Sequence, residues 1–478
     1  MSTFAESIIN QEARGANGMK ALKSSASKCV DLFFSIGASR GKNIVPAFTA
    51  AYVEDRELAL RIVQWARDVR GGAGEREIFR SVLQHLELTA PEDAMRLMLK
   101  VPEIGRYDDL LVFKAPYLKN TAYSMLHTAI KAGNGLAAKW LPREKSSKSA
   151  IAKELMKSFG MDSKTYRKTL ASLTNVVETQ MSGNDWDNIN FSHVPSVAHA
   201  RYRKAFGRHG DTYAEYVSKL VKGDASVKIN ANAIFPHDVL KGRITAGTWN
   251  RQAWSKTELD VIEAQWAALP NFIGDASVLP LVDVSGSMEC AAGKKGSTTC
   301  LEVAVSLGLY FADKNKGKFK DCFLNFSSDP DLLKLTGNIN QKIDQMVTSS
   351  WGMSTDLHKA FDKILATAVK ADVPADEMPK TLVIFSDMNF DCCGRWDDSA
   401  FQMISRKYES AGYTIPQIVF WNLNDNGTTP VKATTNGVAL VSGFSPAIAA
   451  SVLGANPEDF TPEAMMRKSV MVDRYNID

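Results

Sequence analysis

The chain has 478 residues, of which 45% are apolar, 23% charged and 9% aromatic. This composition excludes a disordered chain and a small disulfide-stapled protein, and the length predicts about two to four domains. No run of about 18 apolar residues occurs, and the N-terminal sequence has no basic stretch leading into a hydrophobic one, so we expect no membrane span and no export.

The six cysteines are too few and too unevenly spread to form a disulfide framework. This usage is typical of a reducing compartment, and we therefore expect a cytoplasmic protein. The adjacent Cys392 and Cys393 also lack the spacing of a zinc site.

The formal net charge of +4 conceals an asymmetry between two parts of the chain. Residues 1–270 hold 38 Lys and Arg against 28 Asp and Glu, whereas residues 271–478 hold 19 against 25. Most of the basic excess lies between Lys131 and Arg243, with 19 basic and 10 acidic residues. Such a concentration favours polyanionic partners, and the alternative is a solvated basic surface without a partner.

Residues 1–270 are predicted to be a succession of short helices. Apolar side chains recur at helical spacing over residues 56–70, and three glycines end this helix before a second one over 75–88. Another apolar helix follows Pro91. Repeated antiparallel helices predict a HEAT-like helical-repeat module, arranged as a ring or a solenoid, although the sequence shows no strict period.

Residues 271–478 are predicted to form an α/β domain in which apolar strands alternate with helices. The strands are almost wholly apolar, as expected for a doubly wound parallel sheet that is covered on both faces. In such sheets the ligand binds beyond the carboxyl ends of the strands, so polar residues directly after strands are the site candidates. The expected strands are 277–284, 322–327, 381–387, 417–423 and 437–443, and the expected helices are 298–313, 355–369 and 399–412.

Oxygen-bearing side chains are concentrated at the ends of these strands. Asp283, Ser285 and Ser287 come from one tight loop, Asp387 ends a later strand, and Thr355 opens a helix after a glycine-containing segment. Two carboxylates and three hydroxyls from three loops suit Mg²⁺ or Mn²⁺, with one position left for a partner's carboxylate or phosphate oxygen. The alternative is a vestigial site whose oxygens only cap loops and helices.

Enzymatic use of a bound Mg²⁺ has little support, and we expect no catalytic residues. No GxxxxGK[ST] loop occurs, and the glycine-rich segment 70–76 follows a helix rather than a strand, which is typical of a helix–helix turn. Ser285 lacks the GxSxG frame of a nucleophile elbow, and His358 is typical of a helix surface.

A basic helix is predicted from about Pro195 onwards, within the most basic part of the chain. Arg201, Lys204 and Arg208 would share one narrow face, whereas aromatic residues such as Phe206 would lie on another. This arrangement predicts phosphate contacts on one side and core packing on the other. Stacking of RNA bases on the aromatics is the less favoured interpretation.

The five oxygen-bearing residues resemble, position by position, the metal-ion-dependent adhesion site (MIDAS) of von Willebrand factor A domains, over roughly residues 275–455. Helical hairpins followed by such a domain resemble the Ro autoantigen family, in which a TROVE module of helical repeats is closed into a ring by the A domain. That resemblance implies a ribonucleoprotein that binds noncoding RNAs and single-stranded RNA ends through basic surfaces.

The sequence is more similar to the family called domain of unknown function 2828. The segments that carry this similarity span most of residues 55–455 and are RDVRGGAGER, WDNINFSHVPSVAHARYRKAF, LVDVSGSM, WGMSTDLHKAF, FSDMNFD and YESAGYTIPQIVFWNL. Membership implies the fold more firmly than an activity.

Two hypotheses follow. The first is a non-enzymatic, Ro-like RNA-binding protein, with a TROVE-like module over 1–270 and a Mg²⁺-binding A domain over 271–478 that closes the ring and recruits partners. The second is a metal-dependent protein-interaction or assembly adaptor, whose protein partner contributes a carboxylate to the metal and whose basic half binds no RNA.

Overall fold

The computed structural model describes residues 12–209, 211–244, 254–293, 298–326, 328–349, 355–391 and 399–477. Cys392 and Cys393 lie outside these ranges, and the cysteines within them form no disulfide. None of the helices in the described ranges is both long enough and apolar enough to cross a membrane.

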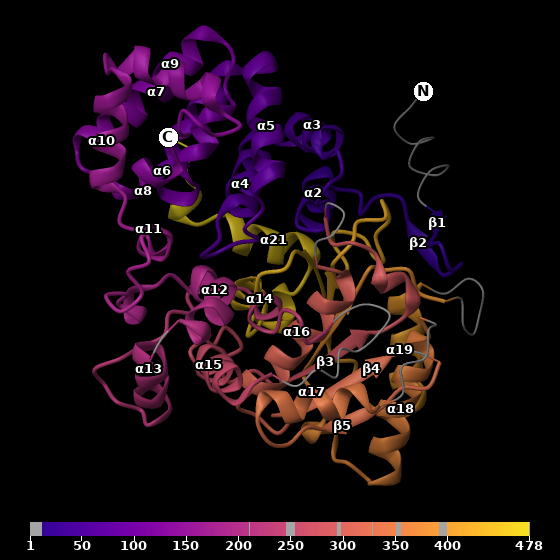
Figure 1. Cartoon of the computed structure of the whole chain (residues 1–478). Coiled ribbons are helices and arrows are strands. Elements are labelled where there is room, and N and C mark those ends of the chain that lie inside the picture. Colours follow the sequence, from indigo (N-terminus) through magenta and orange to yellow (C-terminus); the bar gives the residue numbers. More distant parts are fainter. Residues whose placement is uncertain are drawn as a thin grey trace.

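In the described ranges before residue 270 the chain is largely helical, as predicted, and its first described element is a short β-hairpin, which was not predicted. Its helices run from α2, beside the sheet, through α7, α9 and α10 at the far end, and back through α11 to α15 (Figure 1). The elements are β1 (Glu12–Arg14), β2 (Lys20–Leu22), α2 (Lys28–Ile36), α3 (Val45–Glu54), α4 (Arg56–Arg67), α5 (Arg76–Thr89), α6 (Pro91–Ile104), α7 (Pro116–Lys131), α8 (Gly135–Trp140), α9 (Ser149–Phe159), α10 (Ser163–Leu173), α11 (Val177–Ser182), α12 (Ser196–Arg208), α13 (Asp211–Val221), α14 (Pro236–Val239) and α15 (Lys256–Ala267).

The glycine-rich segment after α4 is a helix–helix turn, as predicted, and leads directly into α5. A Cβ atom on Gly72 would lie 1.8 Å from the carbonyl oxygen of Trp65, so only glycine fits there. Arg67 and Arg80 both pair with the buried carboxylate of Asp109, each at 2.7 Å. The segment therefore fixes how α4 and α5 pack and does not form a phosphate loop.

The second part is built on a six-stranded sheet with the order β5-β4-β3-β6-β7-β8. All neighbours are parallel except β5, which pairs antiparallel with β4 at the edge. The predicted strands and helices are confirmed, whereas β5, α17, α20 and α21 were not predicted. The elements are β3 (Val278–Asp283), α16 (Cys300–Lys314), β4 (Cys322–Phe326), β5 (Leu332–Lys334), α17 (Ile339–Val347), α18 (Leu357–Lys370), β6 (Thr381–Ser386), α19 (Ala400–Ser410), β7 (Gln417–Asn422), β8 (Val438–Ser442), α20 (Ala449–Val452) and α21 (Pro462–Val470).

The two parts share one continuous apolar core, and polar contacts join them at both ends of the chain. On β8, the Ser442 hydroxyl donates to the Phe33 carbonyl of α2 at 2.8 Å. Near the C-terminus, Arg474 pairs with Asp68 at 2.5 Å, and the Tyr475 hydroxyl donates to the same carboxylate at 3.1 Å. The division at residue 270 stays a prediction, because this packing marks no gap between the parts.

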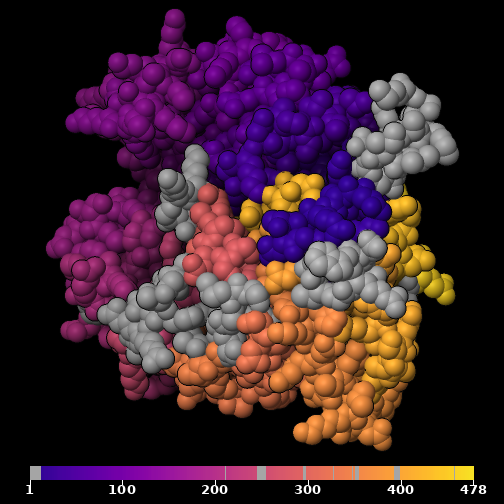
Figure 2. Space-filling model, turned by 90° about the vertical axis from the view of Figure 1, so that its right-hand side faces the viewer, coloured from indigo at the N-terminus to yellow at the C-terminus, as the bar shows by residue number. Residues whose placement is uncertain are grey.

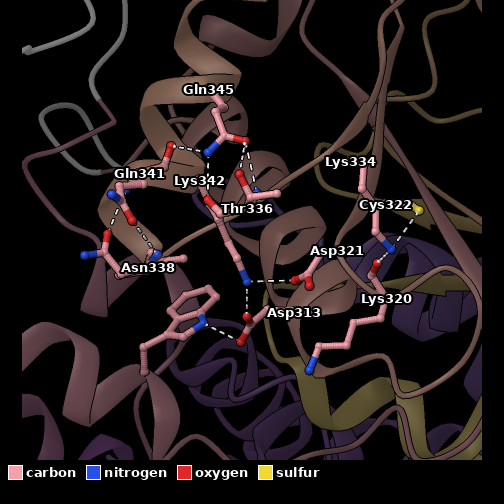
Figure 3. A network of polar contacts seen from close by, with 12 residues as sticks. Asp313, Lys320, Asp321, Cys322, Lys334, Thr336, Asn338, Gln341, Lys342 and Gln345 are labelled. Carbon is pink, nitrogen blue, oxygen red and sulfur yellow. Dashed lines mark hydrogen bonds and ion pairs between the residues drawn. The ribbon is translucent and has the colours of Figure 1, made fainter.

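A charged network fastens α15 to the α/β part (Figure 3). The indole N–H of Trp266 on α15 donates to Asp313 on α16 at 2.9 Å. Lys342 on α17 lies between Asp313 and Asp321, at 2.5 and 2.7 Å. Burial alone would lower the pKa of Lys342, but the hydrogen bonds to the two carboxylates outweigh it and raise the pKa. The ammonium therefore stays charged and connects α17 with α16 and with the segment directly before β4.

Limited proteolysis of the native chain is expected to spare residues 259–277, because Trp266, Leu269 and Ile273 are buried there. The segment contains no Lys or Arg, so thermolysin is the suitable protease and mass spectrometry of the fragments the measurement. Digestion of the urea-unfolded chain shows that the segment is cleavable in principle. Rapid, selective cleavage there in the native chain would instead indicate two independent parts.

Candidate metal centre and basic groove

The parallel pairing of β3 and β6 brings the two predicted acidic ligands to one edge of the sheet. Val282 pairs with Phe385 in register, so Asp283, at the end of β3, and Asp387, directly after β6, leave the sheet next to each other. Both carboxylates are almost completely shielded from solvent. This edge is the carboxyl end of the strands, where doubly wound sheets bind ligands.

The carboxylate of Asp283 accepts the Ser285 N–H at 2.9 Å and the Ser386 hydroxyl at 2.6 Å, and the hydroxyl oxygens of Ser285 and Ser287 lie 3.1 Å apart. Burial, and after it the charge of Asp387, raises the pKa of Asp283 to about 7. Two acidic groups that repel each other in a dry site, surrounded by hydroxyl oxygens, fit a hard divalent cation. The described residues hold no cluster of three or more His, Cys, Asp or Glu for a metal, and the predicted set has only two carboxylates.

Thr355 lies in a loop that is connected to the same edge through other residues. Its N–H donates to Asp391 at 2.9 Å, and the amide nitrogen of Asn17 lies 3.4 Å from its hydroxyl. The same Asn17 nitrogen donates to the Asn389 carbonyl at 2.9 Å, and the Asn389 N–H donates to Asp387 at 3.2 Å. The structure therefore links Asp283, Ser285, Ser287 and Asp387 closely, and Thr355 through Asn17 and Asn389.

Asn17 belongs to the turn of the β1–β2 hairpin, which sequence reasoning missed. The hairpin bridges from Gly18 to Asp391, and Leu22 exchanges two hydrogen bonds of 2.8 Å with Thr429. Figure 2 shows the indigo N-terminal segment lying against the orange and yellow surface of the α/β part. Strands of three residues carry no alternation signal, and the contact from Asn17 to Asn389 spans 372 positions, so no sequence pattern pointed to it.

Helix α12 presents the predicted basic face. Arg201, Lys204 and Arg208 are exposed along it, and the Arg208 guanidinium donates to the Lys204 carbonyl at 3.2 Å. Phe206 is buried on the opposite side, 5.2 Å from the ring of Phe191 and at a steep angle to it. The aromatic residues of this helix thus belong mainly to a local core, which was the favoured interpretation.

Two hollows adjoin this basic face. The first, of about 300 Å³, is lined by Arg201, Lys204 and Lys241, among others. The second, of about 480 Å³, is lined by Lys204 and Arg208 and lies between α12 and α15. The buried Arg203 donates to the Lys241 carbonyl at 3.2 Å and so holds that loop beside α12. Sequence reasoning missed Lys241, because it follows α14 and shares no helical phase with α12.

Comparison with known families divides the chain at the start of the sheet. Residues 15–101 and 136–279 match DUF2828, and residues 277–473 match DUF7788; both families are described as domains of unknown function. The resemblance to domain of unknown function 2828 is thus confirmed for the helical part. The quoted segments from the α/β part fall instead in the stretch that matches DUF7788.

Two individual proteins are also similar to the chain. The uncharacterized protein L728 of Acanthamoeba polyphaga mimivirus is 29% identical over an alignment of 512 residues. The alignment covers 94% of this chain and 86% of the relative. The crystal structure of the RO (RSR) protein of Deinococcus radiodurans matches with a TM-score of 0.47 and 15% identity, covering 93% of this chain and all of the other.

Proposed function

Because the chain carries a domain of the DUF2828 family joined to a DUF7788 domain, and these descriptions state no activity, we propose a function from its own surfaces. The protein binds noncoding or single-stranded RNA, without catalysis, through the basic face of α12. The α/β part closes the ring of helices. It binds Mg²⁺ or Mn²⁺ through Asp283, Ser285, Ser287, Thr355 and Asp387.

The observation that carries RNA binding is the row of Arg201, Lys204 and Arg208, all exposed and beside Lys241. Seven residues separate the first of them from the last, which is about 10 Å along a helix axis. Along the axis of a duplex, each strand places about three charges over that distance, so the row can contact successive phosphates. The resemblance to the Ro family in the sequence supports the same class of partner.

The proposed metal centre uses Asp283 and Asp387 to supply negative charge and the three hydroxyl residues to complete the oxygen set. Mg²⁺ held by these residues would neutralise the two carboxylates and could also accept an oxygen from outside the chain. The contacts of Ser386 with Asp283, and of Asn389 with Asp387, keep the carboxylates oriented. This edge of the sheet therefore also supports the second function, a metal-dependent adaptor whose metal binds an acidic side chain of a partner protein.

Filter binding of structured and single-stranded RNA to the full chain, over a series of salt concentrations, tests the proposal. Phosphate contacts release counterions, so the logarithm of the affinity is expected to fall linearly with the logarithm of salt. Binding at low salt that weakens in this way supports the RNA-binding function. No RNA binding at low salt would leave the adaptor as the better account.

A further inference from the structure

Two cysteines face each other directly after the segment that follows β3, residues 284–289, here called the serine loop. The Sγ atoms of Cys290 and Cys300 lie 3.5 Å apart, and both residues are free thiols. Their backbones are paired as well, because the Cys300 N–H donates to the Cys290 carbonyl at 3.0 Å. Residues that face each other in such an antiparallel pair have Cα atoms about 5.5 Å apart, which lies within the range that disulfides span.

Both sulfur atoms lie against the segment directly after β7, at the same edge of the sheet as the proposed metal centre. The Asn424 amide donates to the Cys290 sulfur at 3.4 Å, and the Cys300 thiol donates to the Leu423 carbonyl at 3.5 Å. A disulfide joins its sulfurs at about 2.0 Å, so the two atoms must approach by roughly 1.5 Å. Rotation of the two side chains covers this distance, because the backbone pair is already formed.

The two cysteines differ in their access to solvent. Cys290 is half-buried, whereas Cys300 is 0% exposed. An oxidant from solution therefore reaches Cys290 first, and Cys300 is placed to react with the sulfur beside it. The other two cysteines of the described ranges have different surroundings: the buried Cys29 sulfur lies 3.6 Å from a backbone carbonyl oxygen, and the Cys322 sulfur lies 3.9 Å from a lysine ammonium.

We propose that Cys290 and Cys300 are a redox-sensitive pair, which hydrogen peroxide converts to a disulfide that ties the serine loop to the first residue of α16. The Cys290 thiolate attacks the peroxide, the O–O bond breaks, and a Cys290 sulfenic acid and one water molecule form. The Cys300 sulfur then attacks the sulfenic sulfur, the S–S bond forms, and a second water molecule leaves. In total the two thiols lose two electrons and two protons, and the peroxide is reduced to two water molecules.

The disulfide restrains the serine loop, which carries two of the proposed metal ligands. The loop forms a short turn in which the Met288 N–H donates to the Ser285 carbonyl at 3.1 Å, and the Cys290 N–H donates to the Ser287 carbonyl at 3.2 Å. A covalent link from Cys290 to the buried start of α16 limits how far this turn can open. The redox state of the pair therefore sets how freely the two serine hydroxyls move.

Titration of the reduced full chain with hydrogen peroxide, followed by alkylation of the remaining thiols and tryptic mass spectrometry, tests the pair. Trypsin cleaves at the lysines between the two cysteines, so the disulfide joins the otherwise separate peptides 257–294 and 296–314. This cross-link is expected to appear before oxidation of Cys322, and dithiothreitol should reverse it. Oxidation of Cys322 first, or conversion of Cys290 to the sulfinic acid without a cross-link, overturns the inference.

Two variants assign the roles of the two thiols. Cys300→Ser removes the second thiol and keeps a hydroxyl that can donate to the Leu423 carbonyl, so the Cys290 sulfenic acid should accumulate and be trapped there by dimedone. Cys290→Ser should abolish both the cross-link and the dimedone adduct. The matched control is Cys322→Ser, which removes another half-buried thiol and should form the cross-link as readily as the wild type. If the control loses the cross-link equally while circular dichroism shows it to be folded, the pair is not the reactive site.

Hydrogen–deuterium exchange of the reduced and the oxidised wild-type chain measures the restraint. Amide exchange in the serine loop is expected to slow on oxidation and to recover with dithiothreitol, whereas exchange in the distant helix α10 should stay unchanged. Equal exchange of the serine loop in both forms, despite a formed cross-link, overturns the restraint. Faster exchange throughout the chain would show that peroxide damages the fold instead of closing the pair.

Discussion

Changing Arg201, Lys204 and Arg208 together to Glu is expected to remove most of the RNA affinity of the chain. Each phosphate contact contributes about −0.9 to the log–log salt slope on a duplex and about −0.7 on a single strand, so the slope should flatten by roughly two to three units. The loss should be similar for RNAs of different sequence, because phosphate contacts carry no sequence information. Filter binding of wild type and variant over the same salt series measures both effects.

The control for this variant reverses three other exposed basic residues, Lys164, Arg167 and Lys168 on α10, and so changes the net charge equally. Its affinity and slope should remain close to those of the wild type. If both triple variants lose affinity equally, binding is a diffuse charge effect. If the α12 variant retains wild-type affinity and slope while circular dichroism shows it to be folded, the RNA contacts lie elsewhere on the protein.

Asp283→Asn is expected to abolish stabilisation of the chain by Mg²⁺ or Mn²⁺. A ligand that binds only the native state raises the free energy of unfolding by about 2.7 kcal/mol at a hundredfold excess over its Kd. The Ser285 N–H and the Ser386 hydroxyl donate to different oxygens of Asp283. Asn keeps one oxygen for the Ser285 N–H, and its NH2 group can donate to the Ser386 hydroxyl oxygen instead, so the metal-free stability should change little. Ala would leave both donors unpaired and cost about 1–3 kcal/mol in addition.

Thermal melting with and without each metal measures the stabilisation. Asp362→Asn is the control, because Asp362 is an exposed carboxylate on α18 that takes no part in the metal centre. It should retain the full shift of the wild type. A shift in wild-type melting no larger than that of Asp283→Asn would show that the oxygens only hold the loops in place.

The α/β part was predictable because its local signals agree with its tertiary structure. The apolar segments ending at Asp283 and Asp387 are short, bounded by polar residues and buried on both faces, which fits central parallel strands. Once these strands are parallel neighbours, their carboxyl ends must meet, and the two acidic residues come together. The order of strands in the sequence therefore sufficed to bring the two acidic residues of the proposed metal centre to the same edge of the sheet.

Features that depend on long-range contacts were not predictable. Asn17 reaches Thr355 and Asn389 only because the hairpin folds back over the sheet edge. Lys241 lies beside α12 only because the buried Arg203 binds its carbonyl. Strand β5 is three residues long, partly exposed and at the sheet edge, so it lacks the apolar run that marked the other strands.

The basic face of α12 illustrates what helical periodicity predicts and what it does not. Helical periodicity correctly placed Arg201, Lys204 and Arg208 together and Phe206 in the core. The periodicity gave no information on what lies opposite the face, because α13, α14 and α15 reach it through tertiary packing.

RNA binding through the α12 face is tested most directly by filter binding of the wild-type chain to structured and single-stranded RNA between low and physiological salt. Three phosphate contacts on a single strand predict measurable affinity at low salt. They also predict that the logarithm of the affinity falls with the logarithm of the salt concentration with a slope of about −2 or steeper. Absence of binding at low salt, or an affinity independent of salt, would contradict RNA binding through this face.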